Sequence, residues 1–349
     1  MSDHRPSHAT GRITTASFRP AWWLPGAHLQ TLWPSLTRTR PGLVALNRRR
    51  IELTDGDFID LSVSSSSGPK VLIIHGLEGD LNSHYSASLT LSLAEAGFCP
   101  LFMHLRGCSG EPNRLARSYH SGSSDDLHQV LRDLARDPED FPTAAIGISL
   151  GANLLLKYLG ERGRERGEEG DGKHHRMPDD QQAAFLDTAI AISPPFVLRD
   201  AMLRLNHGVS RLYRTHLLRR LKRNFKRKFA SRHCPLNVNL DNIRDFNALD
   251  EQITAPLCGF AGVFDYYNQT SCRSYLPAIT TPTLILHARD DPFLYPASIP
   301  FESELGPGVT LELSPHGGHV GFVSGPWPWQ AEYWLEKRIL EHLECYRTG

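Results

Sequence analysis

One short turn between an apolar run and a helical segment constrains this chain more than any other feature. Residues 147–151 read Gly-Ile-Ser-Leu-Gly and join the apolar run 144–148 to a Leu-rich segment at 150–159. A serine in so tight a turn takes a strained backbone conformation, and flanking glycines remove side chains that would collide with neighbouring elements. We therefore predict a strand-to-helix turn that presents Ser149 as a nucleophile, with a flexible glycine-rich loop as the competing interpretation.

Short apolar runs of the kind found in strands buried on both faces recur along the chain. Helical segments separate several of them, which predicts an α/β fold with a mostly parallel, doubly wound sheet. Together with the Ser149 turn, this pattern is typical of the α/β-hydrolase fold. The predicted strands are residues 70–75, 99–105, 144–148, 188–192, 283–286 and 309–313, and the predicted helices include 86–97, 125–137 and 150–159.

The segment before these runs has a different periodicity. Residues 50–53 and 58–63 alternate apolar and polar side chains around Asp55 and Gly56. Alternation on both sides of an Asp-Gly pair predicts a β-hairpin with one buried and one solvated face. We expect this N-terminal hairpin to form an antiparallel edge of the sheet.

The chain is expected to form a single domain over residues 21–345. The first twenty residues are polar and predict a flexible N-terminal segment. Residues 160–182 are charged and glycine-rich with few apolar side chains, which predicts a solvated surface insertion. Residues 195–255 form a long helical block between two predicted strands, and an insertion at this position predicts a lid over the pocket.

Composition narrows the function classes. The 349 residues contain 38 Lys and Arg against 38 Asp and Glu, so net charge gives no general attraction to nucleic acid. The six cysteines show no CxxC pair and no zinc-ligand spacing, which favours reduced thiols and a cytoplasmic location. No run approaches the roughly 18 apolar residues of a spanning helix, and the first twenty residues lack a secretory signal. We expect neither a cofactor nor a metal.

Local charge is less even than the total. Residues 211–228 carry many Arg and Lys side chains with Leu and Phe interleaved. A solvated outer face of the lid is the favoured interpretation. Peripheral contact with an anionic membrane surface stays open, and no nucleic-acid partner is expected.

A second glycine-containing turn follows the predicted strand 70–75. Residues 75–79 read His-Gly-Leu-Glu-Gly. In an α/β-hydrolase, the loop at this place supplies one oxyanion-hole amide, and the residue after the nucleophile supplies the other. The backbone N–H groups of Leu77 and Leu150 are therefore the predicted donors, with an ordinary turn between a strand and a helix as the alternative.

The acid of a catalytic triad is expected after a late strand. Asp290, Asp291 and Pro292 follow the predicted strand 283–286. Asp291 is the preferred acid because the carboxylate usually precedes a proline-containing turn by one residue. Asp290 is its competitor, since adjacent carboxylates cannot both face the same imidazole.

The base is expected after the last predicted strand, 309–313. His319 lies in Gly-Gly-His-Val-Gly, where small neighbours let the ring reach into the site, so it is the preferred base. His316 is interpreted as a surface or supporting residue. A metal site that uses both histidines lacks a third ligand nearby.

The chain resembles the YheT-like (AB hydrolase 4) family of the α/β-hydrolase superfamily. This resemblance implies hydrolysis of carboxylic esters through Ser149, Asp291 and His319, and eukaryotic relatives act on lipid esters. The chain departs from the family pattern in its charged insertion and at Asp80, where a small hydroxyl residue is common, and Asp80 could alter the pocket rim. The matching segments are residues 25–31, 75–79, 106–113, 118–122, 147–151, 290–293 and 317–322.

These features together predict a serine hydrolase that cleaves small-molecule or lipid carboxylic esters through an acyl-enzyme. The alternative is a catalytically idle binding protein on the same fold. Residues 106–110 and 119–121 are expected to line the site. Cys108, in this stretch, is not expected to be the nucleophile because the fold places no histidine beside it.

Overall fold

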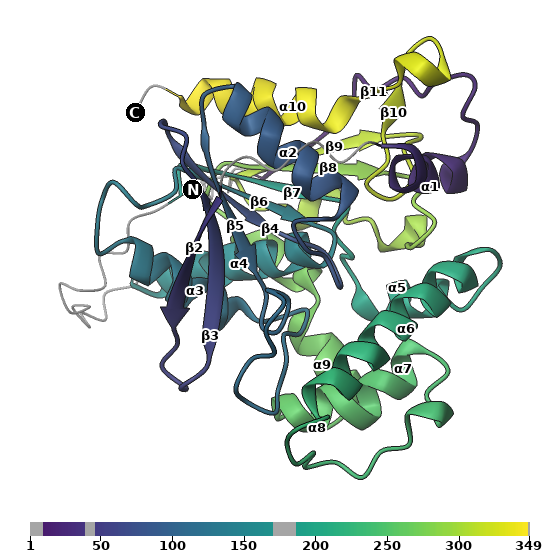
Figure 1. Ribbon diagram of the computed structural model, residues 1–349. Coiled ribbons are helices and arrows are strands. Elements are labelled where there is room, and N and C mark those ends of the chain that lie inside the picture. The colour runs from purple at the N-terminus through teal and green to yellow at the C-terminus, as the bar shows by residue number, and fades with distance from the viewer. Residues whose placement is uncertain (1–9, 39–45, 170–185, 348–349) are drawn as a thin grey trace, which may run out of the picture.

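The computed structural model describes residues 10–38, 46–169 and 186–347. In this part of the chain, nine strands form one sheet in the order β1-β9-β8-β7-β6-β4-β5-β3-β2 (Figure 1). The six predicted apolar runs are confirmed as neighbouring parallel strands of this sheet. Their apolar side chains point to both faces of the sheet, as expected for strands buried on both faces. The strands are β4 (Lys70–Ile74), β5 (Cys99–His104), β6 (Ala144–Ile148), β7 (Thr188–Ile192), β8 (Thr283–Ala288) and β9 (Val309–Ser314).

The two edges of the sheet differ. The predicted hairpin is confirmed as β2 (Leu46–Glu52) and β3 (Phe58–Ser64), an antiparallel pair joined to β5. At the other edge, β1 (Arg12–Thr15) pairs in parallel with β9, so the prediction of a flexible N-terminal segment is wrong for these residues. β1 is short and mostly polar, and it pairs with a strand from the far end of the chain. No local sequence pattern therefore predicts this strand. Residues 1–9 lie outside the described residues.

Helices cover both faces of the sheet (Figure 1). On one face, α2 (His84–Glu95) and α10 (Trp334–Leu343) pack against Val71 and Ile73 of β4. On the other, α3 (Ser124–Leu134) and α4 (Leu150–Glu169) pack against alternate β4 side chains such as Leu72. Because all three β4 side chains are fully buried, the central strands hold a rigid platform for the loops at their carboxyl ends.

Helix α4 runs to Glu169 and so includes the start of the predicted surface insertion. A Cβ on Gly160 would lie 2.3 Å from the carbonyl oxygen of Tyr275, and one on Gly163 would lie 1.7 Å from that of Ala278. These glycines therefore let α4 pack closely on η4 (Cys272–Ala278), which corrects their interpretation as part of a solvated insertion. Residues 170–182 of that insertion lie outside the described residues.

A helical block separates β7 from β8 and lies to one side of the sheet (Figure 1). This matches the helical character predicted for residues 195–255, and the block continues past residue 255. It has a small apolar core of its own, centred on Phe246 and Leu249. We call this block the lid. Its elements are α5 (Leu198–Arg204), α6 (Ser210–Lys228), η2 (Leu240–Asn242), α7 (Phe246–Leu249), η3 (Asp250–Thr254), α8 (Ala255–Cys258) and α9 (Val263–Thr270).

The remaining described elements lie outside the large sheet and the lid, and all of them except α1 are short. None of the described helices is long and apolar enough to cross a membrane. These elements are α1 (Ala27–Thr37), η5 (Pro296–Ser298), η6 (Glu302–Glu304), β10 (Val323–Ser324), η7 (Pro328–Gln330), β11 (Glu332–Tyr333) and η8 (Glu344–Tyr346).

Candidate active site

Ser149 occupies the sharp turn between β6 and α4. Its φ is 54°, in the left-handed region that a residue with a side chain rarely adopts. A Cβ on Gly147 would lie 2.5 Å from the carbonyl oxygen of Gly151, and one on Gly151 would lie 2.3 Å from that of Ile74. The turn therefore has the geometry that the glycine spacing predicts, and no larger residue fits at either glycine without displacing backbone.

His319 lies between a hydroxyl and a carboxylate. Its Nε2 is 2.9 Å from Ser149 Oγ, and its Nδ1 is 2.7 Å from Asp291 Oδ2. Because an ionised carboxylate only accepts hydrogen bonds, Nδ1 carries the proton and donates it to Asp291. The unprotonated Nε2 then accepts from the Ser149 hydroxyl. The structure thus brings together the three residues that the sequence predicts as a catalytic triad.

The two neighbouring aspartates have different partners. Asp291 also accepts a hydrogen bond from the backbone N–H of Phe293 at 2.8 Å, and its side chain is buried. Asp290 accepts from the backbone N–H of Gly318 at 2.9 Å and lies 3.4 Å from the exposed ring of His316. The structure therefore pairs Asp291, and not Asp290, with His319, and leaves His316 at the surface.

Helix α1 supports the loop that carries His319. The backbone N–H of His319 donates to Thr31 Oγ1 at 2.9 Å. A Cβ on Gly318 would lie 2.5 Å from the carbonyl oxygen of Ala27, so glycine is needed for this close approach. The sequence interpretation gave α1 no role in the site. Its only signal was that residues 25–31 match the family pattern.

Aromatic side chains cover the imidazole on its outer side. The Phe293 ring stacks on His319, with ring centroids 4.1 Å apart. Tyr213 of α6 packs on Phe293, and its hydroxyl lies 3.1 Å from Nδ1 of His28 in α1. The sequence interpretation missed these contacts, through which α1 and the lid meet above the histidine.

The loop of residues 75–79 is held by backbone hydrogen bonds around Leu77. The Leu105 N–H donates to His75 Nε2 at 3.1 Å, so His75 Nδ1–H donates to the carbonyl oxygen of Gly76 at 2.7 Å. Burial lowers the pKa of His75 to about 4, which keeps this ring neutral near pH 7. Among the hydrogen bonds of the described residues, none uses the backbone N–H of Leu77 or of Leu150.

A cavity of about 130 Å³ lies beside this loop, between the sheet and the lid. Leu77 and Leu150 form part of its wall next to Ser149. Its lid side is mixed, with apolar side chains such as Leu221 and Phe225 beside charged ones such as Lys222 and Asp250. The stretches 106–108 and 119–121 also line it, which confirms part of the prediction for this loop. The cavity thus lies beside the residue that follows Ser149 in the turn, and its wall combines apolar and polar side chains.

Cys108 lies in the wall of the same cavity. Burial, reinforced by the negative charge of Glu78, raises the pKa of its thiol well above the ordinary value. Only a thiolate is a strong nucleophile, so this environment keeps Cys108 unreactive.

Helix α6 of the lid contacts residues 78 and 80 through polar side chains. The Glu78 carboxylate accepts hydrogen bonds from the Tyr119 hydroxyl at 3.0 Å and from the side-chain amide of Asn224 in α6. Asp80 lies 3.8 Å from Arg220, also in α6. Asp80, the residue after the loop of residues 75–79 and a position at which the chain departs from the family pattern, therefore contacts the lid.

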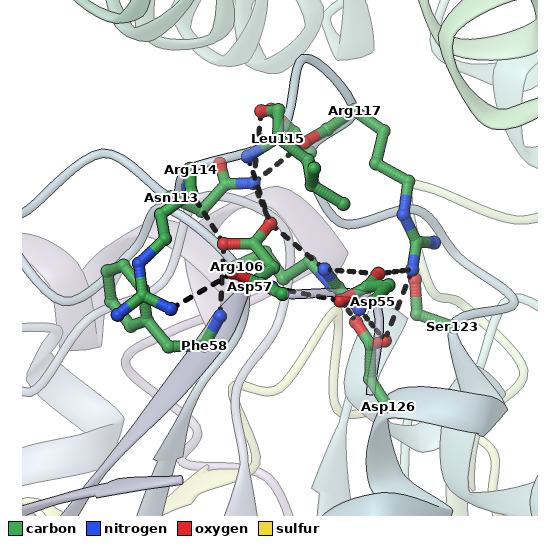
Figure 2. Close-up of polar contacts among 12 residues, drawn as sticks. Asp55, Asp57, Phe58, Arg106, Asn113, Arg114, Leu115, Arg117, Ser123 and Asp126 are labelled. Atoms are coloured by element: carbon green, nitrogen blue, oxygen red, sulfur yellow. Dashed lines mark hydrogen bonds and ion pairs between the residues drawn. The ribbon is translucent and has the colours of Figure 1, made fainter. Parts of the chain in front are cut away.

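A buried ion-pair network holds the opposite wall of the cavity (Figure 2). The Arg106 guanidinium contacts Asp126 through two nitrogens, at 2.6 and 2.7 Å, and Asp57 and Asp55 at 2.9 Å each. Asp57 also accepts from the side-chain amide of Asn113 at 2.5 Å. The network fixes the loop after β5 against the hairpin turn, which gives the cavity a rigid side.

The lid docks on this loop through Lys228. Its ammonium donates to Asn113 Oδ1 at 2.8 Å and to Ser118 Oγ at 3.0 Å, and only 5% of the residue is exposed. Lys228 thus departs from the predicted solvated face of residues 211–228.

Within the described residues, no group of three or more His, Cys, Asp or Glu side chains could hold a metal ion.

The fold and the Ser149 turn define the class of protein. The family model described as alpha/beta hydrolase fold matches residues 69–326, and the chain belongs to that family. Within it, the chain is YheT-like. It is 39% identical over 341 residues to the Escherichia coli (strain K12) protein named "Putative esterase YheT", covering 95% of this chain and 94% of the relative.

More distant proteins share the same architecture. The chain is 26% identical over 348 residues to "Phospholipase ABHD3" of Mus musculus, covering 95% of this chain and 78% of the relative. Among solved structures, the Pyrococcus furiosus esterase Pf2001 matches with a TM-score of 0.53 and 14% identity, covering 99% of this chain and all of that one. At this identity the structural match supports the fold alone.

Proposed function

We propose that this protein hydrolyses carboxylic esters, with Ser149 as the nucleophile, His319 as the general base and Asp291 as the orienting acid. The observation that carries the proposal is the unbroken hydrogen-bond chain from Ser149 Oγ to His319 Nε2, 2.9 Å, and from His319 Nδ1 to Asp291 Oδ2, 2.7 Å. The names of the relatives, an esterase and a phospholipase, support the same class of reaction.

In the first half of the proposed reaction, His319 Nε2 takes the hydroxyl proton as Ser149 Oγ attacks the ester carbonyl carbon. The negative charge that develops on the carbonyl oxygen is stabilised by the backbone N–H groups of Leu77 and Leu150. Asp291 keeps Nδ1 protonated and stabilises the imidazolium. The bond to the alcohol oxygen then breaks, the alcohol leaves with the proton from His319, and the acyl group stays on Ser149.

In the second half, a water molecule attacks the acyl carbon. His319 takes its proton, the same two amides stabilise the second oxyanion, and the bond to Ser149 Oγ breaks as the proton returns to that oxygen. The carboxylic acid is released, and the enzyme returns to its starting state without a redox change.

The substrate class is a small-molecule or lipid ester. Leu77 and Leu150 next to Ser149, together with apolar lid residues such as Phe225, give the cavity wall a part that suits a hydrocarbon chain. Charged lid residues such as Lys222 line the same cavity and suit a polar part of the substrate. The lid helices between β7 and β8 would shield that chain from water, which strengthens electrostatic interactions at the reacting carbonyl.

The test is labelling of the purified protein with a fluorophosphonate probe, with the modified peptide identified by mass spectrometry. Modification of Ser149, an initial burst of p-nitrophenol from p-nitrophenyl acyl esters, and loss of both in Ser149→Ala are expected. A series of acyl chain lengths then measures which chain the cavity accepts. An unlabelled protein that still binds the esters would instead favour a catalytically idle binding protein.

A further inference from the structure

Three tryptophan side chains form an exposed cluster beside β10 and β11. Trp22, Trp327 and Trp329 expose 69%, 44% and 77% of their surface. The rings of Trp22 and Trp327 meet edge to face at 5.4 Å, and those of Trp327 and Trp329 stack at 5.7 Å. Trp22 Nε1 donates to the carbonyl oxygen of Pro326, so the polar edge of this ring is turned toward the protein. The tryptophan cluster therefore presents mainly hydrocarbon to its surroundings.

Further exposed apolar residues lie on α1 and near the start of α6. Leu29 and Leu36 of α1 are 47% and 78% exposed, and Leu212 of α6 is 69% exposed. Leu29 and Leu212 each neighbour one partner of the contact between His28 and Tyr213, which lies above His319. In Figure 1, α1, β10, β11 and the turn between α5 and α6 all lie on the right-hand side of the molecule. Two of these exposed leucines thus adjoin the contact that covers His319.

Helix α6 adds a row of positive charge. Arg219, Arg223 and Lys226 are exposed and spaced by three or four residues, which places them on one face of the helix. We call this face the basic stripe. The helix contains no Asp or Glu, and among the described residues its single ion pair uses Arg220. The charge of the basic stripe is therefore not neutralised within the described part of the protein.

Each half of this surface favours the same partner. Tryptophan rings settle at the boundary between hydrocarbon and headgroups, because they combine a large apolar area with a polar edge. Unneutralised Arg and Lys side chains attract the headgroups of anionic lipids. A symmetric contact with a second copy would bring two basic stripes toward each other, which charge repulsion opposes.

We propose that the tryptophan cluster and the basic stripe form a docking surface for an anionic phospholipid bilayer. Contact with the bilayer would place α1 and the start of α6, which meet above His319, beside the headgroups. This goes beyond the proposed ester hydrolysis, because docking does not require Ser149 to react.

The test is flotation of the full chain with vesicles of phosphatidylcholine, with and without phosphatidylglycerol. Binding is expected only with phosphatidylglycerol, and it should weaken as salt rises. Trp22→Ala/Trp327→Ala/Trp329→Ala should lower the partition coefficient by on the order of tenfold. The control Phe264→Ala/Phe301→Ala removes two aromatic rings that are 59% and 71% exposed on other elements, and it should bind like the wild type.

A second variant tests the charge. Arg219→Gln/Arg223→Gln/Lys226→Gln removes the exposed cations of the basic stripe, none of which lines the cavity, and binding should fall about fivefold for each cation. Both surface variants should keep the wild-type circular dichroism and the wild-type rate on a water-soluble p-nitrophenyl ester. Ser149→Ala should bind vesicles normally, so failure of docking and failure of the proposed hydrolysis are distinguishable.

Three results would overturn the proposal: no binding to either vesicle, equal binding with and without phosphatidylglycerol, or wild-type binding by the tryptophan variant. A dimer in sedimentation velocity that disappears in the tryptophan variant, together with no vesicle binding, would identify a second copy as the occupant. Blue-shifted tryptophan fluorescence on phosphatidylglycerol vesicles, quenched by brominated lipid and lost in the tryptophan variant, would support docking.

Discussion

The ring of Phe293 lies parallel to the imidazole of His319, with the planes 6° apart and the centroids 4.1 Å apart. The backbone N–H of the same phenylalanine donates to Asp291 at 2.8 Å. One residue therefore restrains both the ring that would transfer the proton and the carboxylate that orients it.

Replacing this ring should slow the chemistry more than it weakens substrate binding. An aromatic pair contributes about 0.5–1.5 kcal/mol, so Phe293→Ala should lower kcat on a short ester by up to about tenfold. KM should change little, because Phe293 does not line the cavity. The measurement is steady-state kinetics together with the rate of fluorophosphonate labelling, with Phe264→Ala as the exposed control. An unchanged labelling rate would show that the imidazole is held without this contact.

The two aspartates offer a matched pair of substitutions. Asp291→Asn keeps the shape of the side chain but no longer stabilises the imidazolium or the required tautomer, so kcat should fall on the order of 10⁴-fold. Asp290→Asn should have a much smaller effect, because Asp290 contacts Gly318 and His316 instead. Equal losses in the two variants, measured with the same p-nitrophenyl ester, would contradict the assignment of Asp291 as the acid.

The strands and turns that can be predicted from the sequence depend on residues close together in the chain. Continuous apolar runs are enough to find the central strands, and glycines around Ser149 and His319 mark turns where the backbone must approach closely. The contacts that were missed join distant parts of the chain. Thr31 and His319 are separated by 288 positions, and β1 takes its partner from β9. Neither contact leaves a periodic pattern, because each depends on how the completed sheet brings its edges and loops together.

The glycines of the Ser149 turn should tolerate no side chain. In Gly151→Ala the new Cβ would lie 2.3 Å from the carbonyl oxygen of Ile74, which β4 holds in place. We expect loss of fluorophosphonate labelling and a lower thermal midpoint. Gly262→Ala is the control, because its nearest neighbour is the flexible side chain of Glu251 at 3.4 Å. A Gly151→Ala protein with wild-type labelling would show that the turn relaxes easily.

The buried network in Figure 2 should be costly to break. Arg106→Ala leaves Asp57 and Asp126 buried without their cation, which should lower the free energy of unfolding by about 3–5 kcal/mol. The control is Arg136→Ala, whose side chain is 82% exposed and pairs with Asp133 at the surface, so it should leave the urea midpoint nearly unchanged. Urea unfolding of both variants makes the comparison, and similar midpoints would contradict a structural role for the network.

Asp250 should make stability depend on pH. It lies in η3, lines the cavity and is 7% exposed. Burial raises the pKa of its carboxyl from 3.8 to about 6, although the hydroxyls of Thr254 and Tyr267 donate to it and oppose the shift. The folded state therefore binds more protons than the unfolded state between about pH 4 and 6. Its contribution to the free energy of unfolding falls as pH rises through that window.

Asp250→Asn removes this titration. The difference in free energy of unfolding, wild type minus variant, should fall by about 1 kcal/mol per pH unit between about pH 4 and 6 and stay level above about pH 7. Thr254→Val should move the decline to higher pH, because it removes a hydroxyl that favours the carboxylate. Urea unfolding from about pH 4 to about pH 8 measures all three proteins. A constant difference between wild type and Asp250→Asn would mean that this carboxyl titrates alike in the folded and unfolded states, which would require water to reach it through the cavity.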